Sequence, residues 1–351
     1  MGMRPVYGHD DLLNRLGGSI ATGRFPQVSL FTGPRGAGKQ RVALWVAQGL
    51  LCEAGGEKPC GACRSCRQAA ELIHPDLHWF VPIPRPKVAD AKKQIDAAQE
   101  LLAGIMAERR AEPLYSPADG MLGYPIAAIR LLHRVVAVSP FSARCKVIVL
   151  GDAERLVIQE ASPEAANALL KVLEEPPADT TIILTAERPD RLLPTVRSRL
   201  VPLGIRRVSD EAVESFLRVE LKTELAPDEL QRRVFLAEGC IGRALSAEDD
   251  AEPAQAASRF LDAVRSGAGG WARRAFRQPP WAARGAFSSM LDALALSLRS
   301  QLATEGNLSR GDLRRTVEAL KKVEETRTAA RGNVNPQLAL AVLGQQLEGL
   351  T

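Results

Sequence analysis

The segment Gly33–Gln40, GPRGAGKQ, matches the phosphate-binding loop of P-loop proteins up to its final residue. A short apolar run, Gln27–Thr32, precedes the loop, and Lys39–Leu51 follows it with the apolar spacing of a helix. A P-loop requires this order of strand, loop and helix, because the loop amides and the helix amino terminus bind phosphate together. The motif therefore predicts an α/β domain.

The loop residues indicate a degenerate nucleotide site. Gly33, Gly36 and Gly38 let backbone amides approach phosphate oxygens. Lys39 adds a positive charge at the β and γ positions, but Gln40 stands where the motif has the Ser or Thr whose hydroxyl binds Mg²⁺. An amide on a longer side chain is a poor substitute in a tight octahedral shell. The alternatives are a loop that hydrolyses nucleotide poorly, a relic of a working site, or a glycine-rich turn without a ligand.

A second nucleotide-binding element is expected at Val147–Asp152, an apolar strand whose final aspartate can hold Mg²⁺ through water. Ala153 follows, where an ATPase of this class has the glutamate that polarises the attacking water. Glu154 is one residue further on and should point elsewhere from a strand or tight turn. Loss of a general base removes about 10²–10⁴-fold in rate. Two altered positions, Gln40 and Ala153, favour a site that no longer hydrolyses nucleotide.

Four of the six cysteines crowd into one short segment: Cys52, Cys60, Cys63 and Cys66. Two overlapping C-x₂-C units plus a fourth thiolate predict a closed tetrahedral Zn²⁺ site, which would be structural rather than catalytic. The alternative is a cluster of unpaired thiols. Cys145 and Cys240 are expected to be ordinary core or surface thiols.

Composition predicts a soluble protein of two or three domains, since the chain has 351 residues with 46% hydrophobic and 25% charged residues. The amino-terminal MGMRPVYGHD lacks the apolar run of a signal peptide, which favours the cytoplasm, and no apolar run is long enough to cross a membrane. A net charge of +5 permits contact with nucleic acid without indicating it.

Three later apolar runs have the composition of buried parallel strands: Leu77–Val81, Lys146–Leu150 and Thr181–Thr185. Pro84–Gly123 breaks this rhythm with a long charged helix, which predicts an insertion between two strands. From about Val208 the strands stop, and the rest of the chain has helical spacing.

Three segments now point to one family: the cysteine segment 52–66, SPEAANALLKVLEEPP at Ser162–Pro177, and PTVRSRL at Pro194–Leu200. Together they resemble the bacterial clamp-loader subunits of the DNA polymerase III holoenzyme, which belong to the AAA+ superfamily. Two more segments are similar to family segments, His74–Phe80 (HPDLHWF) and Val334–Leu340 (VNPQLAL). The resemblance covers most of the chain, excluding Pro84–Gly123 and parts of the last hundred residues.

The resemblance implies a RecA-like α/β domain at 1–205, with its zinc knuckle at 52–66 and the insertion at 84–123. A small helical lid would follow at 206–247, and a helical collar at 248–351. The collar would join subunits into a hetero-pentameric ring with gamma or tau and delta, acting on the sliding clamp and primer-template DNA. No membrane partner is implied.

The family contains two kinds of subunit. Gamma and tau are motors with an intact GK[ST] loop and a DE pair, whereas the stator, delta prime, has degraded versions of both. Gln40 and Ala153 therefore favour the delta prime kind, and Gly242 of GCIGRAL, where motors have a sensor arginine, departs in the same direction. The alternatives are a motor subunit, or another AAA+ protein without zinc such as a DNA-junction helicase or a chaperone. Whether ATP or ADP is still bound stays open, as does the sensor position, Thr185 or Glu187.

Arg199 gains its interest from the resemblance, because a single arginine is by default a solvated surface residue. The family motif is Ser-Arg-Cys, and its arginine reaches the γ-phosphate held by the neighbouring subunit. Such trans arginines are worth about 10³–10⁵ in rate. Here Ser198 and Arg199 are kept and the cysteine has become Leu200, which leaves the arginine chemistry available. The resemblance implies a stator that completes its neighbour's site.

Overall fold

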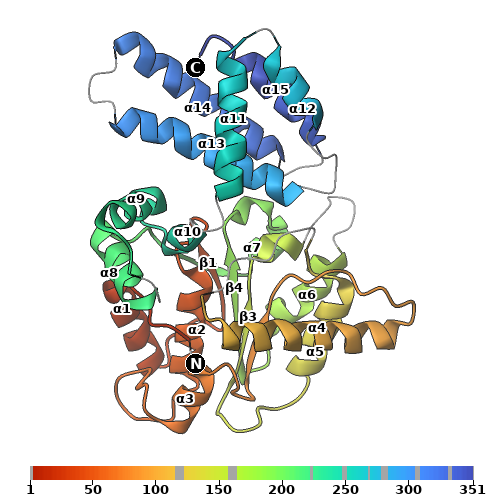
Figure 1. Ribbon diagram of the computed structural model, residues 1–351. Helices are drawn as coiled ribbons and strands as arrows, with labels where there is room; N and C mark the ends of the chain where they lie inside the picture. The colour runs from red at the N-terminus through yellow and green to blue at the C-terminus, as the bar shows by residue number, and fades with distance from the viewer. Residues whose placement is uncertain are drawn as a thin grey trace. The chain divides into compact units, whose positions relative to one another are not determined.

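The structure is a computed structural model that describes residues 3–114, 122–156, 164–221, 224–246, 251–267, 269–277, 284–304, 309–330 and 334–350. The chain forms two compact units, Met1–Leu245 and Ser246–Thr351 (Figure 1). Ser162 and Pro163, the expected start of one family helix, lie outside the described residues, as does the predicted boundary at 247. The division into three domains with boundaries at 205 and 247 stays a prediction.

The first unit contains a parallel five-stranded sheet of order β2-β3-β4-β1-β5. Its strands are β1 Val28–Thr32, β2 Leu77–Phe80, β3 Lys146–Leu150, β4 Thr180–Ala186 and β5 Val201–Gly204. All five residues of β3 are buried, as expected where helices cover both faces of a parallel sheet. The predicted α/β fold with a parallel sheet is confirmed, and each of the four predicted strands is present.

Strand β5 was not predicted, because its sequence VPLG has neither an apolar run nor β-branched periodicity. It pairs with β1 at the sheet edge, where Val201 lies opposite Ser29, and most of its residues are exposed. Pro202 is tolerated there because an edge strand needs hydrogen bonds on one side only.

Seven α-helices flank the sheet: α1 Asp10–Ala21, α2 Lys39–Leu50, α3 Arg64–Ala70, α4 Ala91–Ala111, α5 Ile126–Val136, α6 Glu164–Glu174 and α7 Pro194–Arg197. Helices α1 to α3 lie on one side and α4 to α6 on the other (Figure 1). The turn from β1 into α2 is the P-loop, at the carboxyl edge of the sheet where α/β proteins place their ligands.

The segment Pro84–Gly123 leaves and rejoins the domain at one point. Ile83 and Gly123 exchange two backbone hydrogen bonds, of 2.8 and 3.1 Å, which close the base of the segment. The long charged helix expected there is α4, which packs on α5 and buries Ile95 and Leu102. The Cζ atom of Arg109 lies 4.0 Å from the Trp79 ring centroid, so a cation–π contact also joins α4 to β2.

Three helices follow the sheet: α8 Asp210–Glu220, α9 Pro227–Ala237 and α10 Ile241–Ser246. They have a core of their own, built around Val213, Phe216 and Val234. Helix α8 begins at a serine cap, as the Ser209 hydroxyl accepts the Ala212 amide. The amino-terminal segment is tied to this group, because the Tyr7 hydroxyl donates to Glu220 at 2.7 Å.

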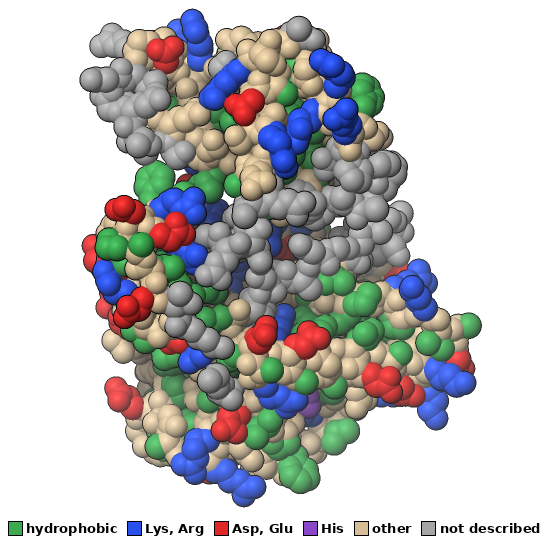
Figure 2. Space-filling model, in the orientation of Figure 1, with side chains coloured by type: hydrophobic (Ala, Val, Ile, Leu, Met, Phe, Trp, Pro, Cys, Tyr) green, Lys and Arg blue, Asp and Glu red, His purple; other side chains and the backbone are tan. Residues whose placement is uncertain are grey.

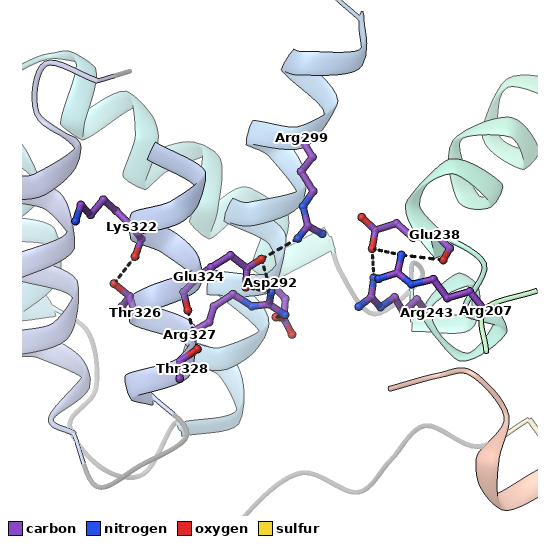
Figure 3. Close-up of polar contacts among 10 residues, drawn as sticks. All are labelled: Arg207, Glu238, Arg243, Asp292, Arg299, Lys322, Glu324, Thr326, Arg327 and Thr328. Atoms are coloured by element: carbon purple, nitrogen blue, oxygen red, sulfur yellow. Dashed lines mark hydrogen bonds and ion pairs between the residues drawn. The ribbon is translucent and has the colours of Figure 1, made fainter. Parts of the chain in front are cut away.

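The second unit is helical in its described residues: α11 Ala251–Arg265, α12 Gly270–Arg277, α13 Arg284–Thr304, α14 Arg310–Ala330 and α15 Pro336–Leu347. Helices α13 and α14 are joined by charges, since Arg327 pairs with Asp292 and with Glu324 on its own helix, and Arg299 also pairs with Glu324 (Figure 3). None of the described helices of either unit has the length and apolar content needed to cross a membrane.

A buried carboxylate organises the loop that leads into β3. Asp76, in the HPDLHWF segment, is 1% exposed and accepts hydrogen bonds from the amides of Phe141, Ser142 and Ala143 and from the Ser142 hydroxyl. Burial tends to raise the pKa of Asp76, but these donors together lower it below the ordinary value for aspartate.

We therefore expect Asp76→Asn to destabilise the first unit by about 2–4 kcal/mol, since the amide group presents donors to donors. The matched change Asp228→Asn, at an exposed position, should have little effect. Because the folded pKa of Asp76 is depressed, its contribution is full above the unfolded pKa of about 3.9 and is lost as pH falls through the lower folded value. Urea denaturation at pH 7 and pH 3 measures both effects, and equal stability of the two variants at pH 7 would refute the assignment.

Candidate nucleotide site and cysteine cluster

The P-loop has the backbone conformation that its glycines predict. Gly36 and Gly38 have φ angles of 82° and 86°, in the left-handed region that favours glycine. Gly38 occupies the N-cap of α2, so the loop runs directly into the helix amino terminus. A phosphate-binding geometry is therefore retained in outline.

Lys39 makes its hydrogen bonds within the loop. It is buried, and its Nζ atom donates to the carbonyls of Gly33 and Pro34, both at 2.9 Å. Burial lowers the pKa of Lys39, while the carboxylates of Asp152, Glu154 and Glu187 act to raise it. The Lys39 charge is thus stabilised by two loop carbonyls and by nearby carboxylates of the same chain.

Gln40 lies against the backbone that leads into Asp152. Its Oε1 atom is only 2.7 Å from where a Cβ atom would stand on Gly151, so the carboxamide packs directly on that glycine. Among the described residues Oε1 has no hydrogen-bond partner, although it is buried. The Asp152 amide donates to the Thr185 hydroxyl at 3.1 Å. With an amide where Mg²⁺ requires a hydroxyl, this donor set does not match an active P-loop site.

Glu154, which was expected to point elsewhere, lies near Lys39 and contacts Glu187. It lies in the 3₁₀ turn Ala153–Leu156, and its Oε1 atom accepts the Glu187 amide at 3.0 Å. Burial raises its pKa. The tight turn after β3 swings this carboxylate toward the end of β4, which the periodicity of a strand could not predict. Thr185 and Glu187, the two candidate sensor positions, contact Asp152 and Glu154 respectively.

Helix α10 docks directly on the P-loop. The Gly242 amide donates to the Gly36 carbonyl at 2.9 Å, and a Cβ atom on Gly242 would lie 2.8 Å from the Gly36 Cα atom. Only glycine fits at this contact. The Arg243 side chain turns away to pair with Glu238, which also pairs with Arg207 at 3.2 Å (Figure 3). Arg243 is thus held by the predicted lid itself.

A cleft of about 470 Å³ lies between the amino-terminal segment and the start of α8, lined in part by Tyr7, Gly8 and Ala212. The loop glycines are not among its lining residues. On the drawn face of the described surface, acidic and basic side chains of the first unit are interspersed (Figure 2). No broad basic patch appears on that face.

The four clustered cysteines converge. Their Sγ atoms all lie within 4.8 Å of one another, with Cys60 and Cys66 at 3.9 Å and Cys52 and Cys63 at 4.0 Å. Four thiolates bound to Zn²⁺ at about 2.3 Å are about 3.8 Å apart in a tetrahedron, so the cluster fits such a metal. Hydrogen bonds to the Cys60 sulfur, first from the Cys63 amide and then from the Ala62 amide, lower the pKa of Cys60 to about 6. Cys63 also caps α3, so the helix fixes two of the ligands.

Arg199 lies apart from the P-loop residues. It follows α7 and precedes β5, and β5 starts where Val201 pairs with Ser29. From Ser29 the strand β1 continues for about 13 Å before Gly33 begins the loop. Among the described residues the polar contacts of Arg199 are with Thr195, Ser198 and Glu174. The structure therefore does not bring Arg199 to the site formed by Lys39, Gln40 and Asp152.

Residues 8–209, more than half of the chain, match the family described as DNA polymerase III, delta subunit. The chain belongs to this family. Membership agrees with the parallel sheet followed by helices, so the predicted AAA+ fold class is confirmed.

The relatives include both kinds of subunit. The chain is 30% identical over 250 residues to DNA polymerase III subunit tau of Escherichia coli, an alignment covering 70% of this chain and 32% of tau. It is 31% identical over 199 residues to subunit delta' of Bacillus subtilis, covering 57% of this chain and 48% of the relative. A crystal structure of a DNA polymerase III gamma subunit-related protein from Thermotoga maritima covers 97% of this chain and 99% of its own, with 16% identity and a TM-score of 0.44. The chain thus spans about a third to a half of the curated relatives' length.

The contact between α10 and the loop predicts the effect of adding one methyl group. Gly242→Ala should force Gly36 and α10 apart at a cost of about 1–3 kcal/mol, and so speed hydrogen–deuterium exchange at 33–40. Gly104→Ala is the matched control, because a Cβ atom on that α4 glycine meets nothing within 4 Å. Unchanged exchange at 33–40 in Gly242→Ala would show that the contact does not hold the loop.

Proposed function

We propose that this chain is the delta prime subunit of the DNA polymerase III clamp loader, a stator that does not hydrolyse ATP. The observation that carries the proposal is Gln40 packed on Gly151, with Ala153 two residues further along, in a chain of this family. Sequence identity alone does not choose between the kinds of subunit, since tau and delta' relatives match about equally well.

The chemistry of the site supports the absence of hydrolysis. The hydroxyl that would bind Mg²⁺ is replaced by the Gln40 carboxamide, whose buried oxygen has no hydrogen-bond partner among the residues that the structure describes. The Lys39 ammonium already donates to two loop carbonyls. One of its three donors remains for a nucleotide phosphate, so binding is possible, but the general base expected at Ala153 would still be missing. ATP or ADP binding without turnover is compatible with this reading.

A role in trans is proposed for Arg199. Within the part of the chain that the structure describes, its polar contacts are with Thr195, Ser198 and Glu174 and not with the P-loop, and its side chain is 33% exposed. In the proposed complex it would face the γ-phosphate held by a gamma or tau neighbour. The ring would also contain delta and would act on the sliding clamp and primer-template DNA in the cytoplasm.

A motor subunit of the gamma or tau kind is the second candidate, and one observation favours it. The Glu154 carboxylate lies close enough to Lys39 for their charges to interact, so a displaced general base is available. Against this candidate, Glu154 Oε1 already accepts the Glu187 amide, and Gln40 still lacks the metal-binding hydroxyl.

We also propose that the cysteine cluster binds one structural Zn²⁺. The four thiolates complete a tetrahedron and leave no open position, so the metal would stabilise the segment between α2 and α3 rather than take part in chemistry. Backbone and side-chain contacts support the cluster: Gln48 donates to the Cys66 carbonyl at 2.9 Å, and Arg67 donates to the Ala62 carbonyl at 2.7 Å.

The purified chain should contain about one zinc per molecule by metal analysis. The double change Cys60→Ser and Cys63→Ser should abolish zinc binding and lower thermal stability, because a structural site contributes directly to folding. Cys145→Ser, which removes a thiol outside the cluster, is the control. Full zinc content in the double variant would rule out this ligand set.

Arg199→Ala should lower the ATPase rate of the reconstituted loader by about 10³-fold or more while the chain keeps its fold and still assembles. Arg197→Ala, two residues earlier and also exposed, is the matched control. Steady-state ATP turnover in the presence of clamp and primed DNA measures the effect. Wild-type turnover by the Arg199 variant complex would exclude the trans role.

A further inference from the structure

The guanidinium of Arg199 is held in place by an acidic partner from another element. Its Nη2 atom lies 2.5 Å from Glu174 Oε1, and its Nη1 atom donates to the Thr195 carbonyl at 2.6 Å. One contact comes from the end of α6 and the other from α7, so the side chain is fixed from two directions. Glu174 lies in LEEPP, at the carboxyl end of the family segment Ser162–Pro177.

The end of α6 is itself anchored to the sheet. The side-chain Nε2 atom of Gln27 lies 3.3 Å from the Pro176 carbonyl, 2.5 Å from that of Pro177 and 3.0 Å from that of Thr180. Gln27 immediately precedes β1, so one side chain ties the turn after Glu174 to the central part of the sheet. The carboxylate therefore projects from a backbone that is fixed by hydrogen bonds, not from a free helix end.

We propose that Glu174 is a positioning residue for Arg199: its carboxylate orients the guanidinium before a neighbouring subunit brings its phosphate. This inference rests on the proposed trans role of Arg199. Guanidinium has five N–H donors in a rigid fork, and one carboxylate, one carbonyl and the Ser198 hydroxyl occupy only some of them. Donors remain for a phosphate while Glu174 still holds the group.

The physical benefit is orientation. An arginine side chain has many rotamers, and ordering it at the moment of reaction opposes transition-state binding. A pair that already restricts those rotamers reduces this cost. Because Arg199 and Glu174 are 33% and 46% exposed, the pair itself adds little to folding stability, so variants at Glu174 should fold.

The test is ATPase kinetics of the reconstituted loader with Glu174→Gln, Glu174→Asp and Glu175→Gln. Glu175 is the next residue and is also exposed, so its variant is a control for charge loss at the helix end. We expect Glu174→Gln to lower kcat about 5- to 20-fold with little change in KM, Glu174→Asp to recover part of the loss, and Glu175→Gln to behave as wild type. Assembly, measured by gel filtration, should be unchanged in all three.

Arg199→Ala in the same assay separates the two proposals. If Arg199→Ala is inactive and Glu174→Gln retains wild-type kcat, the positioning role is wrong and the trans role stands. If Arg199→Ala is fully active, the trans role fails first. Adding Glu174→Gln to Arg199→Ala should cause no further loss, since Glu174 acts through Arg199. A raised kcat in Glu174→Gln, or a loss explained by failed assembly, would also overturn the inference.

Discussion

The pairing of β1 between β4 and β5 is the constraint on which both the P-loop and the position of Arg199 depend. Its carboxyl end leads into Gly33 and the P-loop, while the Gln27 side chain before its amino end binds carbonyls of the segment that joins α6 to β4. One short strand therefore fixes the position of the P-loop. Through Gln27 and Glu174 it also fixes the position of the Arg199 guanidinium. A shift of β1 in register would move both together, because every residue of a strand moves with its neighbours.

The retained loop residues have structural roles that do not require a nucleotide. Gly36 packs directly against Gly242 of α10, and the Lys39 ammonium joins the end of the loop to its start through the Gly33 and Pro34 carbonyls. These contacts stabilise the loop whether or not it binds or hydrolyses a nucleotide. Under the proposed function, these packing roles account for the glycines and the lysine in a loop whose Gln40, like Ala153 after β3, differs from the catalytic pattern.

The sequence predicted those features that depend on local pattern. Buried strands, the loop conformation at Gly36 and Gly38, and the convergence of four cysteines follow from apolar runs, glycine spacing and C-x₂-C units. It did not predict β5, whose edge position tolerates proline, or the turn that brings Glu154 to Glu187. The partners of Asp76 and Arg199 could not be predicted either, because contacts between residues distant in sequence leave no periodic signal.

In the proposed function this chain supplies an arginine to another active site and has no working site of its own. The most direct test is ATP turnover by the purified chain alone, with Mg²⁺ and without other subunits. We predict no hydrolysis above the background of a Lys39→Ala control. Steady turnover that Lys39→Ala abolishes would contradict the account and identify the chain as a motor.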